Sequence, residues 1–215
     1  MPKLYVSNST ETSRMFKNNF FESLSKVPFY VPLIIYIPVI AVFIWLALGY
    51  AHCNFFAFLG LFVAGIIMWT LMEYLIHRYP FHYVSSNKTI ARLVWIAHGV
   101  HHDFPRDRLR LVMPPSVSIP VAIIFYLIFW WIFGRPLVYC FFAGFVTGYL
   151  IYDMMHYALH YYRFTSSVMH KLMRHHALHH YKDPGKAFGI SQPFWDYVFG
   201  TNFSKEDLKA PQMTE

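Results

Sequence analysis

Four long apolar runs constrain the fold of this 215-residue chain more than any other feature. They cover residues 31–50, 55–76, 117–133 and 137–159, and each is close to the length of about 20 residues that a helix needs to cross a bilayer. Only 13% of the residues are charged, against about 25% in a typical soluble domain. So short a chain has too little polar material to cover four such helices. We therefore expect an all-α integral membrane protein with four transmembrane helices.

The remaining segments fit one membrane domain over residues 1–215. Residues 13–30 mix pairs of phenylalanine with lysine and glutamate, a pattern typical of an amphipathic helix in the bilayer interface. We expect residues 1–27 to be a cytosolic or interfacial segment and residues 202–215 to be a polar tail. No cleavable signal peptide is apparent, because the first apolar run follows a polar, charged segment.

Basic residues predict the orientation of the four spans. All but Arg135 of the 18 lysines and arginines lie before the first run, between the second and third, or after the fourth. The positive-inside rule places these segments, and both termini, in the cytosol. This bias also explains the formal net charge of +7, so we expect no nucleic-acid partner. The short chain favours the bacterial inner membrane, with the endoplasmic reticulum as the alternative.

Histidine is the anomalous residue, with 13 copies that fall mostly in four short clusters. The clusters read HxxxxH, HxxHH, HxxxH and HxxHH, and the predicted topology puts all four on the cytosolic face. On a helix, residues i, i+3 and i+4 share one side, so each cluster aims its imidazoles at one place. Ten imidazoles are too many for one ion, and they predict a helical cap that holds two metal ions. The expected ligands are His77, His82, His98, His101, His102, His156, His160, His176, His179 and His180.

The last cluster contains a fourth histidine, His175, which helical geometry alone does not distinguish from its neighbours. The repeat of HxxHH favours ligation by His176, His179 and His180, and leaves His175 beside the ligands or on the surface. Metal-bound histidines usually donate their second ring N–H to a carboxylate or a carbonyl. Glu73 and Asp153 precede histidines on the matching helix faces, so we predict that these two acids orient ligands.

Imidazole binds zinc, copper, iron and nickel, so the ligand set leaves the metal open. A di-metal site at the bilayer surface, above an apolar aromatic bundle, indicates redox attack on a lipid chain. Iron can activate O2 for such chemistry and zinc cannot. We therefore expect two iron ions, with zinc able to replace them in a purified sample.

The order of the four clusters resembles the fatty acid hydroxylase superfamily of membrane di-metal oxygenases. Three segments are similar to its fatty acid 2-hydroxylase branch: HGVHHDFPRDRLRLVMPP at 98–115, GYLIYDMMHYALHY at 148–161, and FGISQPFWDYVFGT at 188–201. The resemblance covers roughly residues 14–202, and all ten of the family's ligand positions are histidine here. It implies an O2-dependent di-iron monooxygenase that hydroxylates C2 of a fatty acyl chain, in a ceramide or another sphingolipid or as a free fatty acid.

One departure from the family concerns electrons. Many members begin with a cytochrome b5 domain that carries a His-Pro-Gly-Gly haem motif, and that motif does not occur here. We therefore expect a separate electron donor, similar to cytochrome b5 or to a ferredoxin. The alternatives are a related enzyme that hydroxylates or desaturates another lipid, such as a sterol or carotenoid, and, less favoured, a zinc membrane hydrolase or a metal transporter.

Substrate residues are predicted less sharply than ligands. A chain entering from the bilayer would pass aromatic and methionine side chains near the cytosolic ends of the spans. Arg106, Arg108 and Arg110, with Asp107, either contact the lipid headgroup or order their own loop. Tyr152 lies beside the ligand cluster. The expected tunnel residues are Trp69, Met72, Met113, Tyr149, Tyr152 and Met155.

Overall fold

The computed structural model describes residues 4–209, and this part of the chain is helical without strands. The helices are α1 (Asn19–Leu24), α2 (Tyr30–Trp45), α3 (Phe55–Ile76), α4 (Lys88–Val94), α5 (Val100–Asp103), α6 (Pro115–Phe133), α7 (Leu137–Tyr161), α8 (Ser167–Tyr181), α9 (Phe194–Val198) and α10 (Lys205–Lys209). Three π-helical turns continue or precede them: Leu46–Tyr50 after α2, His77–Phe81 after α3, and Trp95–Gly99 between α4 and α5.

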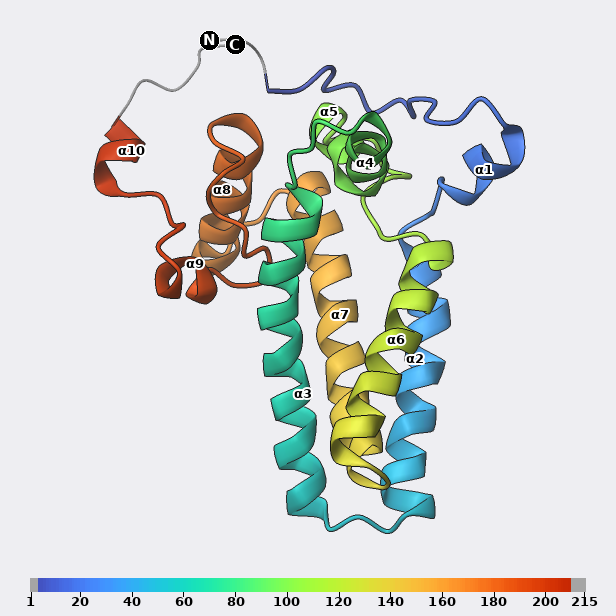
Figure 1. Ribbon diagram of the computed structural model, residues 1–215. Coiled ribbons are helices and arrows are strands. Elements are labelled where there is room, and N and C mark those ends of the chain that lie inside the picture. The colour runs from blue at the N-terminus through green and yellow to red at the C-terminus, as the bar shows by residue number, and fades with distance from the viewer. Residues whose placement is uncertain (1–3, 210–215) are drawn as a thin grey trace.

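Four of these elements are long and apolar enough to cross a membrane, and they confirm the predicted all-α fold with four spans. The spans are Tyr30–Tyr50, Phe55–Phe81, Pro115–Phe133 and Leu137–Tyr161. They form an upright bundle, and the shorter helices gather at one end of it (Figure 1). Mean hydropathy exceeds 2 in the first three spans and falls to 1.5 in the fourth, because the fourth span carries polar side chains toward the site.

Helix α7 is the centre of the bundle. Of its most apolar window, 78% is buried, against at most 17% in the other spans, whose outer faces remain open for lipid. Gly65 of α3 and Gly144 of α7 let these two backbones meet, because a Cβ at either position would overlap a main-chain carbonyl of the other helix. Close approach of this kind through small residues is a common way to pack helices in a membrane.

Local signals in the sequence explain where several helices begin. Asn18, Asn54 and Asn87 precede α1, α3 and α4, and each side-chain oxygen accepts hydrogen bonds from backbone N–H groups of the first turn. These N–H groups have no partner within the helix, so asparagine is favoured at this position. Helix α6 begins with Pro115, whose fixed φ suits a first helical residue and whose missing N–H costs nothing there.

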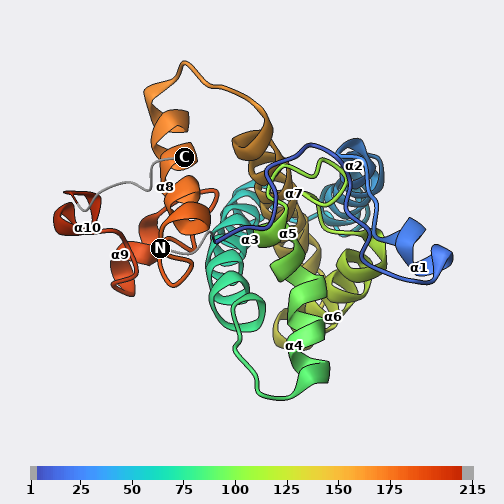
Figure 2. The ribbon, with the colours of Figure 1, turned by 90° about the horizontal axis from the view of Figure 1, so that it is seen from above.

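The cap forms at a single end of the bundle. The N-terminal segment, the segment from α3 to α6 and the segment after α7 all lie at this end (Figure 1), and they surround the tops of α3 and α7 in the perpendicular view (Figure 2). The connection that contains His52 lies at the opposite end. Within residues 13–30, only α1 and the first residue of α2 are helical, so the predicted interfacial helix is much shorter than expected.

Candidate metal centre and lipid cavity

Ten histidines meet beneath the cap in two groups of five. In each group, one potential ligand atom per residue lies within 4.8 Å of the others. The His77 group contains His77, His82, His98, His102 and His179, and the His101 group contains His101, His156, His160, His176 and His180. These are the ten histidines expected from the sequence.

The two HxxHH clusters are shared between the groups. His98 and His102 lie one helical turn apart and enter the His77 group, while His101 between them faces the other group. On α8, His179 enters the His77 group, while His176 and His180 enter the His101 group. Because each cluster contributes to both groups, the two groups must lie side by side.

Nine of the ten imidazoles place Nε2 within 3.2 Å of the Nε2 atom of another imidazole. The Nε2 atoms of His77 and His102 lie 3.0 and 3.1 Å from that of His98. In the other group, the Nε2 atoms of His160 and His180 lie 2.7 and 3.1 Å from that of His176. A proton between two rings can satisfy only one such pair at a time. Five converging nitrogens therefore fit a cation at each centre.

Electrostatics also favour metal binding. Burial, followed by the neighbouring imidazoles, holds the pKa of His98, His101 and His180 well below the ordinary value. Burial lowers the pKa of His82 to about 4 and that of His179 to about 3. Neutral imidazole is the form that binds metal, so these rings are ready as ligands at neutral pH. Residues at two π-helical turns, His77 and His98, contribute to one group, and such turns are frequent at functional sites.

Three histidines are oriented by main-chain carbonyls. Nδ1 of His77 lies 2.6 Å from the carbonyl oxygen of Phe188, and Nδ1 of His179 lies 2.7 Å from that of Lys186. In the other group, Nδ1 of His156 lies 2.9 Å from the carbonyl of Leu111. Donation from Nδ1 leaves Nε2 as the metal-binding atom, as in many histidine metal sites.

Glu73 and Asp153 accept hydrogen bonds from backbone N–H groups and not from the histidine N–H groups that were predicted. Their effect on the ligands is therefore indirect. The Glu73 carboxylate accepts the backbone N–H groups of Ile190 and Ser191, each at 2.7 Å, instead of a histidine N–H. Asp153 accepts the N–H of Met113 at 3.1 Å. Both acids lie on the predicted helix faces, but loops from elsewhere in the chain reach them first. They hold the loops whose carbonyls contact histidines.

His175 lies outside both groups. Its Nε2 is 3.0 Å from the buried carboxylate of Asp196, and it belongs to neither set of converging donors. The structure thus places His175 beside the metal centre and away from its middle, as the repeat of HxxHH predicts. His170, on the same helix, is exposed.

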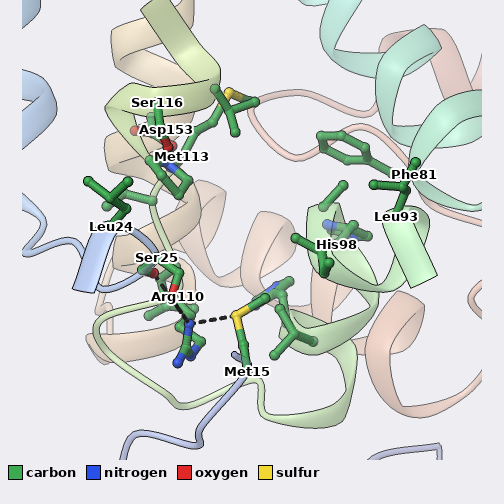
Figure 3. Close-up of a pocket in the computed structure, with 18 of the residues that line it drawn as sticks. Met15, Leu24, Ser25, Phe81, Leu93, His98, Arg110, Met113, Ser116 and Asp153 are labelled. Atoms are coloured by element: carbon green, nitrogen blue, oxygen red, sulfur yellow. Dashed lines mark hydrogen bonds between the residues drawn. The ribbon is translucent and has the colours of Figure 1, made fainter. Parts of the chain in front are cut away.

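A cavity of about 530 Å³ opens beside both groups. His98 of one group and His101 and His156 of the other form part of its wall. Figure 3 shows Phe81, Leu93 and His98 on one side, opposite Met15, Leu24 and Arg110. Most of the remaining lining is aliphatic or aromatic, and Tyr152, Asp153 and Ser116 supply polar atoms.

A second cavity of about 320 Å³ lies among the spans. Phe81, Met113 and Val117 line both cavities, so the two adjoin at these side chains. The second is lined by apolar and aromatic residues of α2, α3, α6 and α7, with Phe125 and Phe145 among them. Of the predicted tunnel residues, Trp69, Met113 and Tyr149 line this cavity, Met113 and Tyr152 line the first, and Met72 and Met155 line neither.

The residues expected at the headgroup separate into different roles. Asp107 is fully buried and accepts hydrogen bonds from Thr12 Oγ1 and the Ser13 backbone N–H, each at 3.0 Å. It orders its loop and cannot reach a headgroup. Arg106 and Arg108 are exposed, and the Arg108 guanidinium lies 4.3 Å from the centre of the Tyr161 ring. Of the five candidates, Arg110 and Tyr152 line the cavity.

Two buried acids, Glu22 and Asp196, escaped the sequence reasoning. Arg110 donates to Glu22 Oε1 at 2.9 Å and also contacts the Met15 sulfur and Ser25 (Figure 3). This network fastens the N-terminal segment over the cavity. Asp196 is fully buried beside His175. Glu22 and Asp196 lie in helices without a recognisable motif, so only their long-range contacts reveal them.

The chain is similar to known proteins over most of its length. The sequence profile of the fatty acid hydroxylase family matches residues 62–201. The chain is 35% identical over 187 residues to the ceramide very long chain fatty acid hydroxylase scs7 of Schizosaccharomyces pombe, covering 85% of this chain and 53% of that protein. It is 33% identical over 191 residues to the dihydroceramide fatty acyl 2-hydroxylase FAH1 of Arabidopsis thaliana, covering 89% and 80%.

Similarity extends to a solved structure, described as full-length scs7p with only its hydroxylase domain visible. It superposes with a TM-score of 0.83 at 34% identity, covering 93% of this chain and 74% of that one. The chain spans about half the length of the Schizosaccharomyces pombe protein and of the fatty acid 2-hydroxylase of Rattus norvegicus, to which it is 35% identical, covering 90% of this chain and 57% of the rat protein. The chain belongs to the fatty acid hydroxylase family.

Proposed function

We propose that this protein hydroxylates C2 of a fatty acyl chain in an O2-dependent reaction. The observation that carries the proposal is the cavity, because it places an apolar chamber against His98 of one histidine group and against His101 and His156 of the other. A lipid in this chamber would meet both metal centres at once. The names of the relatives, which include a ceramide and a dihydroceramide hydroxylase, support the N-acyl chain of a sphingolipid as substrate.

Two iron ions suit the two groups of five imidazoles. Iron supplies the redox chemistry that activates O2 when it is bound, which zinc at the same ligands would not supply. The protein's part is to hold the rings neutral and aimed at two centres, and to keep the surroundings dry. Among the described residues, both groups consist of histidines alone, without a carboxylate. The site therefore differs from soluble di-iron centres, which use mainly glutamate.

The two cavities support one placement of the substrate. We infer that the acyl tail occupies the second cavity and passes between Phe81, Met113 and Val117, so that the carbons next to the carbonyl reach the histidine wall. C2 is next to the carbonyl, and a site at the end of the bundle suits attack close to the head. Tyr152 and Asp153 are the polar side chains near this position. The apolar lining excludes water, which would otherwise compete at the reactive centre.

The distribution of basic residues supports the proposed orientation of the protein in its membrane. Lysines and arginines flank the end of the bundle that carries the site, which supports a cytosolic orientation. A separate cytochrome b5-like or ferredoxin-like protein would then deliver electrons from the cytosol, and a basic face suits an acidic donor. The bacterial inner membrane favoured by chain length gains no support from relatives in yeast, rat and Arabidopsis.

Lipid extraction from expressing cells tests the proposal. We expect 2-hydroxy acyl lipids in cells that express the wild-type chain, and their loss with His101→Ala or His156→Ala. His170→Ala is the matched control, because His170 is exposed on α8 at the same end of the bundle. Hydroxylation at another carbon, hydroxylation of a sterol or carotenoid, or an unchanged lipid profile would reject the proposal.

A further inference from the structure

We propose that Asp196 is a positioning residue that controls metal occupancy of the His77 group alone. It acts through the backbone of residues 186–191, named here the 186–191 strap. The inference rests on the proposed function, because it concerns how one of two metal ions is held. It extends that function by making the two centres unequal, since only one of them depends on this strap.

The strap carries the two carbonyls that orient the His77 group. The Phe188 carbonyl accepts from His77 Nδ1 at 2.6 Å, and the Lys186 carbonyl accepts from His179 Nδ1 at 2.7 Å. Groups that hold the second nitrogen of a ligand histidine fix its tautomer and its aim, and their loss typically weakens metal binding roughly 10- to 100-fold. The direction of two carbonyls thus decides the direction of two ligands.

Asp196 sets the first carbonyl through peptide geometry. The C=O of Phe188 and the N–H of Gly189 belong to one planar trans peptide unit, so they point in opposite directions. Asp196 Oδ2 accepts the Gly189 N–H at 2.8 Å, on the side away from His77. Gly189 permits this approach, because a Cβ there would lie 2.9 Å from Asp196 Oδ2 and would overlap the Gln192 carbonyl.

The second carbonyl is set in the same way, two peptide units earlier. The C=O of Lys186 and the N–H of Ala187 share a unit, and the Ala187 N–H is donated to the Thr201 carbonyl at 2.8 Å. Thr201 in turn donates its Oγ1 to Asp196 Oδ1 at 2.7 Å and its backbone N–H to the Asp196 carbonyl at 2.8 Å. Ala187 is fully buried with φ at 59°, a strained conformation that surrounding contacts must impose.

The Asp196 carboxylate is filled by donors. Oδ1 accepts from the Phe188 N–H at 2.8 Å and from Thr201, while Oδ2 accepts from Gly189 and from His175 Nε2 at 3.0 Å. Four donors match the four acceptor sites of an ionised carboxylate. Asparagine has the same shape but turns one oxygen into an NH2 group, which would face two donors and push part of the strap away.

The His101 group is supported differently. Its carbonyl partner is Leu111, which contacts His156 and lies in the segment before α6. That segment is held by Asp153 through the Met113 N–H. Within residues 4–209, no hydrogen bond or ion pair joins this segment to the 186–191 strap. Loosening the strap should therefore empty one centre and leave the other filled.

Counting metal ions in purified full-length protein by mass spectrometry tests the proposal. With iron supplied during expression, wild type should hold two ions per chain and Asp196→Asn one. Asp196→Asn combined with His82→Ala should still hold one ion, because both substitutions affect the His77 group. Asp196→Asn combined with His160→Ala should hold no ion, because the second substitution affects the His101 group. Two ions in Asp196→Asn, none in that single variant, or the reverse pattern in the double variants would overturn the inference.

Two further variants guard against a folding defect. His175→Ala removes the one donor to Asp196 that belongs neither to the strap nor to Thr201, and this variant should keep both ions. Thr201→Val removes one hydroxyl donor while keeping Asp196, and chelator competition should show one of two ions held at least several-fold more weakly. Equal weakening of both ions, or of neither, would count against Asp196. A wild type with fewer than two ions would instead contradict the di-metal function itself.

Discussion

Replacing Arg110 with methionine should release the N-terminal segment from the cavity. Arg110 is buried and pairs with Glu22, which is itself buried. Methionine keeps much of the side-chain volume but leaves the Glu22 carboxylate without its guanidinium partner. Removing one member of a buried ion pair typically costs about 3 to 5 kcal/mol. This loss of stability should be confined to residues 13–25, because Arg110 holds them against the loop before α6.

The pKa of Glu22 gives an independent magnitude. Burial alone would raise it, but the backbone N–H groups of Phe16 and Met15, with Lys26 and Arg110, lower it from 4.5 to about 2. At about 1.4 kcal/mol per pH unit, this corresponds to roughly 3 kcal/mol of stabilisation shared among these partners. Because the pKa is depressed in the folded state, this contribution is complete above pH 4.5 and is lost as the pH falls toward 2.

Hydrogen exchange measures the expected effect. At neutral pH, a loss of roughly 3 kcal/mol should speed exchange of the protected amides in residues 13–25 by about 100-fold. Arg108→Met is the matched control, because Arg108 is exposed and should leave exchange unchanged. Adding Glu22→Gln to Arg110→Met removes the stranded charge and should recover part of the protection. Unchanged exchange in Arg110→Met, or equal loss in the control, would refute the reasoning.

Three other substitutions follow from the site and the bundle. His176→Ala should lower metal content and abolish activity, while His175→Ala should keep the metal, and equal metal content in the two would contradict the assignment. Ala122→Phe should fill part of the second cavity and shift product profiles by mass spectrometry toward shorter acyl chains; an unchanged profile would place the tail elsewhere. Gly144→Leu should force α3 and α7 apart, and a thermal unfolding midpoint equal to wild type would show that their contact is not limiting.

The sequence predicted the spans and the ten converging histidines because these depend on local patterns. The backbone polar groups of a membrane-spanning segment must find their hydrogen-bond partners within one continuous helix. The length of the helix can therefore be read from consecutive residues. Histidines at helical spacing share a face whatever the rest of the fold does. Both inferences need only the distance along one helix and the side of the membrane on which each loop lies.

The division into two groups could not be read from that spacing. In HxxHH, His98 and His102 join one group while His101 joins the other, and helical geometry allows either partition. Glu73 shows the same limit, because its side chain meets backbone groups of Ile190 and Ser191, more than one hundred residues away. Such partners are chosen by tertiary packing, which the sequence pattern of one helix does not contain.

The most direct test of the central claim uses purified protein reconstituted with iron. The protein would receive a reductant, a ceramide with a labelled acyl chain, and O2 enriched in heavy oxygen, and the lipid would be analysed by mass spectrometry. We predict one heavy oxygen atom at C2 of the acyl chain, absent without reductant and absent in His156→Ala. A lipid that gains no oxygen, gains it from water, or carries it at another carbon would contradict the proposed C2 monooxygenase.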